Sequence, residues 1–133
     1  MRFCIARNIS IAFVAACAAL CAPQKAVAQV NAEQVMNIGR NVLSMEDYML
    51  AIQYFNQAIK AKPYLAEPYY LRALAKLNLE DYQGAVDDAT LSIERNKFIT
   101  EAFRLRGFCL QNLGRDSLAI LDYNVGLRYA PED

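Results

Sequence analysis

Hydrophobic residues in the middle of the chain recur with the spacing of two amphipathic helices. Tyr69, Ala73 and Leu77 fall at i, i+4 and i+8, which places them on one face of a helix. A second apolar stripe with helical spacing follows over residues 82–93. The pattern predicts two helices joined by a short polar turn, each with one buried face.

This pattern returns along the chain at a fixed interval, and small residues mark it on both helices. They are Gly39, Ala73 and Gly107 on the first helix and Ala51, Ala85 and Ala119 on the second. A period of about 34 residues indicates stacked repeats. The chain therefore divides into units at 32–65, 66–99 and 100–133, behind a short lead at 29–31. The small residues are predicted to let the two helices of each unit pack closely, because glycine within a helix otherwise costs about 1 kcal/mol.

The N-terminal segment, residues 1–28, follows a different pattern. Arg2 and Arg7 precede an apolar run over residues 9–22, and the small residues Ala26-Val27-Ala28 follow it. This layout is typical of a secretory signal peptide, with cleavage before residue 29. The run of about 14 residues is shorter than the roughly 20 that cross a membrane. We therefore expect an exported chain with no membrane span after cleavage.

A lipid anchor is the alternative to soluble export. The segment Val14-Ala15-Ala16-Cys17 resembles the bacterial lipobox, in which an acylated cysteine holds a protein on a membrane. Soluble export is preferred, because the apolar run continues past Cys17 and a well-formed cleavage site lies downstream. The short basic start and the alanine-rich cleavage site favour a bacterial envelope, with a periplasmic or envelope-associated protein.

Loss of the leader changes the charge and the cysteine content. The full chain has fourteen basic and fourteen acidic residues, and eleven and fourteen remain after residue 28, a net charge of −3. Neither balance favours a nucleic-acid partner, which normally goes with a basic surplus. Of four cysteines only Cys109 remains, so no internal disulfide can form. We expect Cys109 to pack in the core as a small apolar residue.

The candidate chemistry argues against an enzyme. The sequence has no histidine, which is the commonest general base and a frequent zinc ligand, and no glycine-rich phosphate loop. Asp87 and Asp88 are neighbours, and adjacent residues of a helix do not face the same way. We therefore expect no catalytic residue, no metal site and no cofactor.

The three units resemble tetratricopeptide repeats, whose 34-residue pattern contains an aromatic residue, Leu-Gly, Tyr, Ala, Phe and a closing Pro. The matching residues are Gly39, Ala51, Phe55, Ala58 and Pro63, then Tyr69, Ala73, Tyr82 and Ala85, then Phe103, Gly107, Leu110, Ala119, Tyr123 and Pro131. The resemblance implies an all-α fold, in which tandem helix-turn-helix hairpins stack into a right-handed α-solenoid.

Three positions depart from the family's pattern. Lys76 stands where an apolar residue is usual, and we expect its side chain to reach water. Lys97 replaces the closing proline, so the second helix of the middle unit is expected to continue toward Phe98. Asp116 replaces a tyrosine and is expected to start a helix, because aspartate favours helix starts.

Two opposite charges recur together. Arg72 and Arg106 occupy the same place in successive units, and Asp88 and Asp122 follow the two arginines at one and the same interval. In the first unit neither place is charged. We predict the ion pairs Arg72–Asp88 and Arg106–Asp122 across the two helix hairpins. The alternative is four independent solvated charges.

The resemblance also implies a concave groove, lined by the first helix of each unit, that binds a protein or peptide. The lining residues that it implies are Met36, Arg40 and Ser44, then Tyr70, Leu74, Leu77 and Asn78, then Arg104, Phe108, Gln111 and Asn112. Aromatic residues and arginine are frequent in binding hot spots. The alternative is an ordinary solvated helix face.

One ligand is not expected in this groove. Some members of the family hold the C-terminal carboxylate of cytosolic chaperones with Lys, Asn and Arg at five places. The residues at those places are Met36, Arg40, Leu71, Glu101 and Leu105. Four of the five cannot supply the required donor, so we reject a chaperone tail as the ligand.

We predict an exported scaffold or adaptor that binds another protein. The alternative is the N-terminal binding region of a larger envelope enzyme or receptor. Repeat arrays need polar caps, yet apolar residues remain on the last helix at Leu118, Leu121, Val125 and Tyr129. We expect another segment, another subunit or the partner to cover them, which includes self-association through the uncapped C-terminal repeat.

Overall fold

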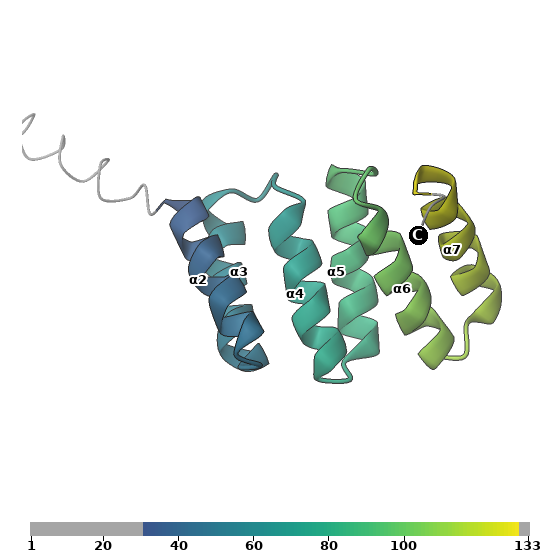
Figure 1. Ribbon diagram of the computed structural model, residues 1–133, viewed down its shortest axis with the longest axis horizontal. Coiled ribbons are helices and arrows are strands. Elements are labelled where there is room, and N and C mark those ends of the chain that lie inside the picture. The colour runs from purple at the N-terminus through teal and green to yellow at the C-terminus, as the bar shows by residue number, and fades with distance from the viewer. Residues whose placement is uncertain (1–30, 131–133) are drawn as a thin grey trace, which may run out of the picture. The chain divides into compact units, whose positions relative to one another are not determined.

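The computed structural model describes residues 31–130, which form a row of helices (Figure 1). The helices are α2 (Ala32–Ser44), α3 (Tyr48–Ala61), α4 (Glu67–Asn78), α5 (Tyr82–Arg95), α6 (Thr100–Asn112) and α7 (Asp116–Tyr129). Residues 31–130 contain no strand, so the predicted all-α fold is confirmed. The signal peptide at 1–28, the lipid anchor at Cys17 and the closing Pro131 lie outside the described residues.

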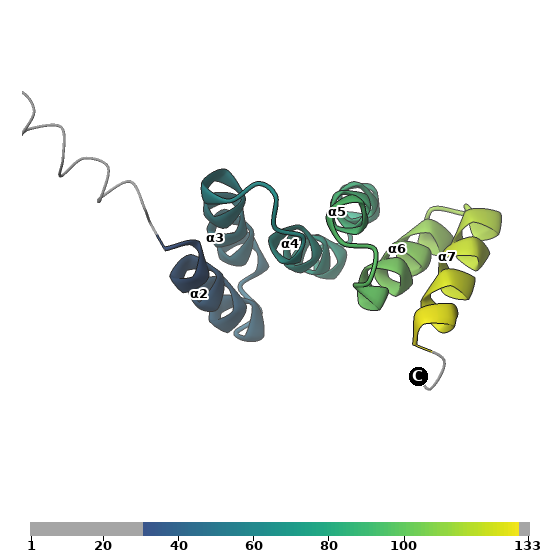
Figure 2. The same ribbon diagram turned by 90° about the horizontal axis from the view of Figure 1, so that it is seen from above.

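Successive helices form hairpins. α2 packs with α3, α4 with α5 and α6 with α7, and each hairpin packs against the next. Seen from above, α2, α4 and α6 lie on one side of the row and α3 and α5 on the other (Figure 2). The second helices begin at Tyr48, Tyr82 and Asp116, so their starts keep the repeat period of the sequence. Asp116 starts a helix, as expected.

The turn within each hairpin contains one residue with a left-handed backbone. Glu46, Glu80 and Gly114 have φ angles of 64°, 60° and 73°. Glycine adopts this conformation freely, whereas another residue costs about 1–2 kcal/mol there. Asp47 and Asp81 follow the two glutamates, and the side chain of each accepts a backbone N–H of the helix that it precedes. These caps satisfy donors that the helix start would otherwise leave unpaired.

The end of α5 differs from the sequence expectation. The helix stops at Arg95 and does not continue to Phe98, although Lys97 replaces the proline. Asn96 has an extended backbone, and its side-chain oxygen accepts the Phe98 N–H at 3.0 Å. Such a local side-chain hydrogen bond competes with helical hydrogen bonds. The expectation was wrong because asparagine ends the helix without proline.

All six predicted repeat-packing residues are buried. They are Gly39, Ala51, Ala73, Ala85, Gly107 and Ala119. A Cβ atom added to Gly39 would lie 2.7 Å from Phe55 Cε1, and one added to Gly107 would lie 2.9 Å from Tyr123 Cε1. The middle unit has alanine at both of these places, and Ala73 and Ala89 belong to one buried cluster. Two different pairings, aromatic with glycine and alanine with alanine, therefore occupy equivalent positions.

Candidate binding groove

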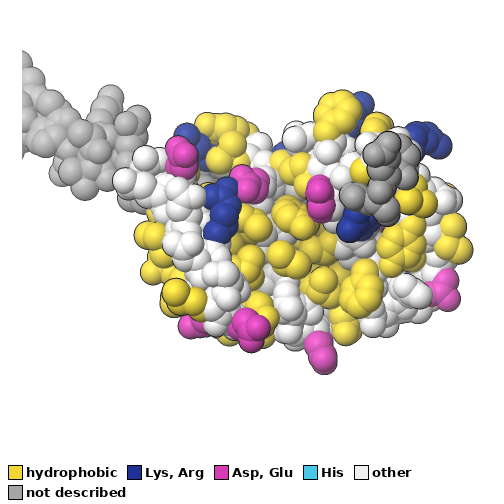
Figure 3. Space-filling view, viewed as in Figure 1, with side chains coloured by type: hydrophobic (Ala, Val, Ile, Leu, Met, Phe, Trp, Pro, Cys, Tyr) yellow, Lys and Arg dark blue, Asp and Glu magenta, His cyan; other side chains and the backbone are white. Residues whose placement is uncertain are grey.

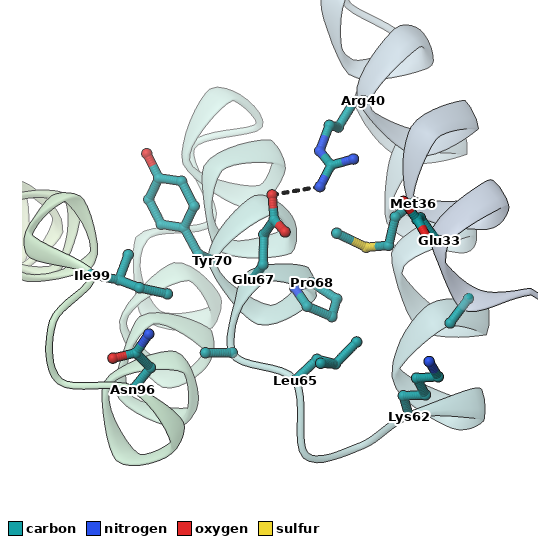
Figure 4. A pocket seen from close by; sticks show the side chains of 12 residues that line it. Glu33, Met36, Arg40, Lys62, Leu65, Glu67, Pro68, Tyr70, Asn96 and Ile99 are labelled. Carbon is teal, nitrogen blue, oxygen red and sulfur yellow. Dashed lines mark hydrogen bonds and ion pairs between the residues drawn. The ribbon is translucent and has the colours of Figure 1, made fainter.

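The first helices α2, α4 and α6 form one face of the row. Hydrophobic side chains gather over the middle of this face, and charged side chains of both signs lie along its upper part (Figure 3). A hollow of about 710 Å³ lies between the starts of α2 and α4, and the connections that precede α4 and α6 contribute to its wall (Figure 4). The hollow is large enough to receive several side chains of a ligand.

An ion pair spans the hollow from α2 to α4. Arg40 donates to Glu67 Oε1 at 2.6 Å (Figure 4). Arg40 also donates to Asn37 Oδ1 at 2.6 Å. The side chains of Arg40 and Glu67 are 38% and 54% exposed. An ion pair this exposed contributes at most about 1 kcal/mol to stability. A ligand group can therefore replace either partner at little cost to the fold.

Tyr70 lies where the two hydrophobic clusters of the row meet, and its ring packs against both. Burial raises the pKa of the Tyr70 hydroxyl, the Glu101 carboxylate raises this pKa further, and the Arg104 guanidinium lowers it. The Tyr70 hydroxyl on α4 thus lies within electrostatic reach of Glu101 and Arg104 on α6. Tyr70 can support a ligand with its ring while its hydroxyl stays protonated at neutral pH.

The structure brings only part of the predicted groove together. Of the eleven residues predicted to line the groove, Met36, Arg40 and Tyr70 line the hollow. Leu74 and Phe108 lie outside its lining: Leu74 is partly buried against the core, and Phe108 is 48% exposed. The hollow therefore covers one end of the predicted groove.

Three other predicted groove residues, Arg104, Asn78 and Asn112, also interact within the fold. The stem of Arg104 lies against α7, because a Cβ atom added to Gly126 would lie 3.3 Å from Arg104 Cγ. Asn78 and Asn112 each donate a side-chain N–H to the carbonyl oxygen one helical turn earlier, both at 2.8 Å. Each bond links the last residue of its helix to the preceding turn. The two amides thus stabilise the ends of α4 and α6, whether or not a ligand also uses them.

Sequence reasoning missed several residues of the hollow. Glu33 and Glu67 line it, and a glutamate stands at the second place of every unit, since Glu101 is their counterpart. That repetition was a usable signal. Lys62 and Asn96 come from the connections between units. No helical periodicity marks those connections, so the sequence pattern does not single them out.

Both ion pairs expected from the sequence are present. Arg72 donates from Nε to Asp88 Oδ2 at 2.8 Å and from Nη2 to Oδ1 at 2.6 Å. Arg106 bonds Asp122 in the same two-pronged way, with both distances 2.7 Å. Asp88 and Asp122 are 2% and 6% exposed. Two-pronged pairs of this kind fix the geometry of both side chains.

Each arginine also reaches the preceding unit. Arg72 Nη1 donates to Asn56 Oδ1 of α3 at 2.7 Å, and Arg106 Nη1 donates to Thr90 Oγ1 of α5 at 3.1 Å. Each arginine therefore joins three helices. In the described part of the chain no helix pair precedes the first unit. The uncharged Ile38 at the equivalent place therefore has no preceding helix to bond.

Lys76 adds a second cation to the Asp88 site. Its Nζ lies 2.9 Å from Asp88 Oδ2, and its side chain is 23% exposed. The side chain of Lys76 is partly exposed, as expected, but its ammonium group also pairs with a buried carboxylate that the sequence analysis did not assign to it. In the third unit Leu110 stands at the equivalent place, so Asp122 receives no cation from there.

Cys109 is fully buried in α6. Burial raises the pKa of its thiol to about 11, and the Asp81 carboxylate adds to the rise. Because the thiolate is the reactive form, less of it exists at pH 8 in the folded chain than in the unfolded chain. We expect iodoacetamide to alkylate the folded chain at pH 8 at least ~100-fold more slowly than the denatured chain, and faster as the pH approaches 11. Intact mass against time measures this, and equal rates would contradict the buried assignment.

Two further chemistries find no support in residues 31–130. These residues contain no group of three or more Cys, Asp and Glu side chains placed to hold a metal ion. None of the helices α2 to α7 combines the length and the apolar character that a membrane crossing requires.

The stacked helix hairpins, with their first helices along one face, place this fold among the helical-repeat proteins. The family model "Tetratricopeptide repeat" matches residues 35–64. A comparison with curated proteins found no match. Proteins built from such repeats are typically interaction modules rather than enzymes.

Three similar solved structures extend the likeness along the row. The first TPR of Spaghetti (RPAP3) bound to the HSP90 peptide SRMEEVD has a TM-score of 0.75 and 25% identity, over 77% of this chain and 81% of that one. The Arabidopsis OM64 TPR domain has a TM-score of 0.75 and 26% identity, over 77% and 84%. The second TPR domain of human RPAP3 with the HSP70 peptide SGPTIEEVD has a TM-score of 0.75 and 25% identity, over 80% and 88%. These findings support the tetratricopeptide repeat family for this chain.

Proposed function

We propose that the protein is an exported scaffold or adaptor that binds a segment of another protein on the face of α2, α4 and α6. The hollow beside Arg40 carries this proposal. Met36, Leu65 and Pro68 give it apolar lining, and Arg40 and Glu67 place opposite charges across it. Ligand sites commonly combine an apolar lining with a few polar groups that fix orientation.

The similar structures support peptide binding, but their peptides indicate a different ligand. The peptides bound to Spaghetti and to human RPAP3 both end in Glu-Glu-Val-Asp. At the places where some relatives hold such an end, Met36, Leu71 and Leu105 are apolar and buried, and Glu101 is acidic. At these five places an acidic chain end would meet one cation, Arg40, and one repelling carboxylate, Glu101. We therefore propose a ligand other than an acidic C-terminus.

The location of the partner follows from the leader. The basic start, the apolar run and the small-residue cleavage site of residues 1–28 support export. The proposed partner is accordingly a protein of the periplasm or the bacterial envelope.

A variant that alters the face without opening the core tests the groove. Arg40 and Phe108 are both substantially exposed, so the double change Arg40→Ala, Phe108→Ala should leave the helical circular dichroism unchanged. We expect it to weaken capture of the envelope partner at least ~10-fold, because central aromatic and arginine contacts usually contribute about 1 kcal/mol or more each. Quantitative pull-down from envelope extracts with the chain from residue 29 measures this.

The control is the double change Met49→Ala, Leu50→Ala on α3. These residues are 62% and 38% exposed and belong to a second helix, away from the groove face. Capture should be unchanged. Undiminished capture by the groove variant, or an equal loss in the control, would refute the assignment of this face.

A further inference from the structure

Inside the row, each second helix forms a seat for the first helix of the next unit. Val86 of α5 lies in one buried cluster with Leu105 and Cys109 of α6. Phe55 of α3 lies in another with Leu71 of α4. The same kind of interface therefore occurs twice, with apolar residues on both of its sides.

The last helix, α7, has apolar residues at positions equivalent to those of this interface in α5. Ile120 stands one full repeat after Val86, and Leu127 stands one full repeat after Ile93. Val86 is 9% exposed beneath α6, whereas Ile120 and Leu127 are 58% and 53% exposed. No helix of the described part covers them. We call Ile120, Tyr123 and Leu127 the α7 seat.

The opposite end of the row lacks the matching surface. The residues that α4 and α6 turn toward the preceding helix are buried: Pro68, Leu71 and Ala75, and Ala102, Leu105 and Cys109. The equivalent residues of α2 are Gln34, Asn37 and Asn41, and all three are exposed. The exposed surface of α2 at one end of the row is therefore polar, whereas the exposed surface of α7 at the other end is apolar.

We propose that the α7 seat binds one amphipathic helix of a partner protein, with small or apolar residues at i, i+3 and i+7 as in α4 and α6. The occupant follows from continuity, because α7 repeats the surface on which α6 lies. A second copy of the chain matches this surface poorly head to tail. Its α2 would place the side-chain amides of Gln34 and Asn37 against apolar Ile120, and burying amides that lack hydrogen-bond partners is unfavourable. This surface is distinct from the hollow beside Arg40 and would bind a second partner segment.

The chain itself provides the probe. A synthetic peptide of residues 66–80 contains the α4 stripe, and a peptide of residues 32–46 contains the polar α2 stripe at the same length. Short helices are marginal in water, so a hydrocarbon staple replaces the side chains at Ala73 and Leu77 in the probe and at Gly39 and Leu43 in the control. In the chain, Ala73 and Leu77 pack with α5 of their own unit, opposite the docking stripe.

Fluorescence anisotropy of the labelled peptides measures binding to the chain from residue 29. We expect the 66–80 peptide to bind at least ~10-fold more tightly than the 32–46 peptide. Ile120→Lys should weaken binding of the 66–80 peptide at least ~10-fold. Because Ile120 is exposed, this change should leave the fold intact, which circular dichroism checks. The groove variant Arg40→Ala, Phe108→Ala should bind like the unchanged protein.

Three results would overturn the proposal. The first is equal affinity for the two peptides. The second is loss of peptide binding in the groove variant with no loss in Ile120→Lys. The third is a dimer in sedimentation that Ile120→Lys dissociates. The last result would identify a second copy as the occupant. Since the groove variant is measured in parallel, failure of the α7 seat is distinguishable from failure of the groove.

Discussion

Replacing Asp88 with alanine is expected to lower the free energy of unfolding by about 3 kcal/mol, the lower end of the range for a broken buried ion pair, because the change leaves two partly buried cations without their carboxylate. Arg72 and Lys76 both bond Asp88, and their side chains are only 17% and 23% exposed. Water cannot fully replace the lost partner at such positions. Chemical denaturation followed by circular dichroism measures the change.

Asp87→Ala is the matched control, at the neighbouring position of the same helix. Asp87 is exposed and accepts a hydrogen bond from Gln83 Nε2 at 2.9 Å. Its loss should change the free energy of unfolding by no more than ~0.5 kcal/mol. Asp122→Ala should fall between the two, because Leu110 replaces the lysine that supports Asp88. Equal losses for Asp87→Ala and Asp88→Ala would mean that the pairs behave as solvated surface charges.

Replacing Phe55 with alanine is expected to cost about 3–5 kcal/mol, because its fully buried ring would leave a cavity. The informative test combines this change with Gly39→Ala. In the unchanged protein Gly39→Ala should destabilise, since the new Cβ atom would lie 2.7 Å from the Phe55 ring. In the Phe55→Ala background it should stabilise by up to about 1 kcal/mol, because alanine favours a helix and only Tyr54 Cβ, at 3.2 Å, remains close.

The reversal of sign is the result that matters, and denaturation of the four proteins in the cycle measures it. The middle unit is the natural precedent, with Ala73 and Ala89 at these places. Gly126→Ala is the control, because the nearest atom to its added Cβ is Cγ of the flexible Arg104 side chain at 3.3 Å. It should be close to neutral. Destabilisation by Gly39→Ala in both backgrounds would show that the ring is not the obstacle.

The sequence predicts those features of the fold that recur in each unit. Helix pairs, buried small residues and both arginine–aspartate pairs follow from this recurrence, because equivalent places have equivalent neighbours. The roles of Lys76 and Asn96 do not follow from this recurrence. Each acts through a contact that only its own unit contains, to Asp88 and to the Phe98 N–H. A contact that occurs in one unit only cannot be recognised by comparing equivalent positions of the three units.

The candidate site was predictable in location but not in composition. The first-helix positions identified the face, and Arg40 and Tyr70 lie at its hollow. Lys62 and Asn96 complete the wall from connections whose path depends on local turn geometry. Helical periodicity contains no information on where such loops place their side chains.

The arginines that join three helices have a consequence for the thermodynamics of recognition. Arg72 and Arg106 tie each hairpin to the one before it at both of the joints described, through Asn56 and Thr90. These hydrogen bonds favour one angle between hairpins before any ligand arrives. To that extent a ligand meets a preformed surface, and association costs less conformational entropy of the scaffold. The curvature of the row is thus a form of preorganisation that polar side chains between the hairpins, rather than the ligand, supply.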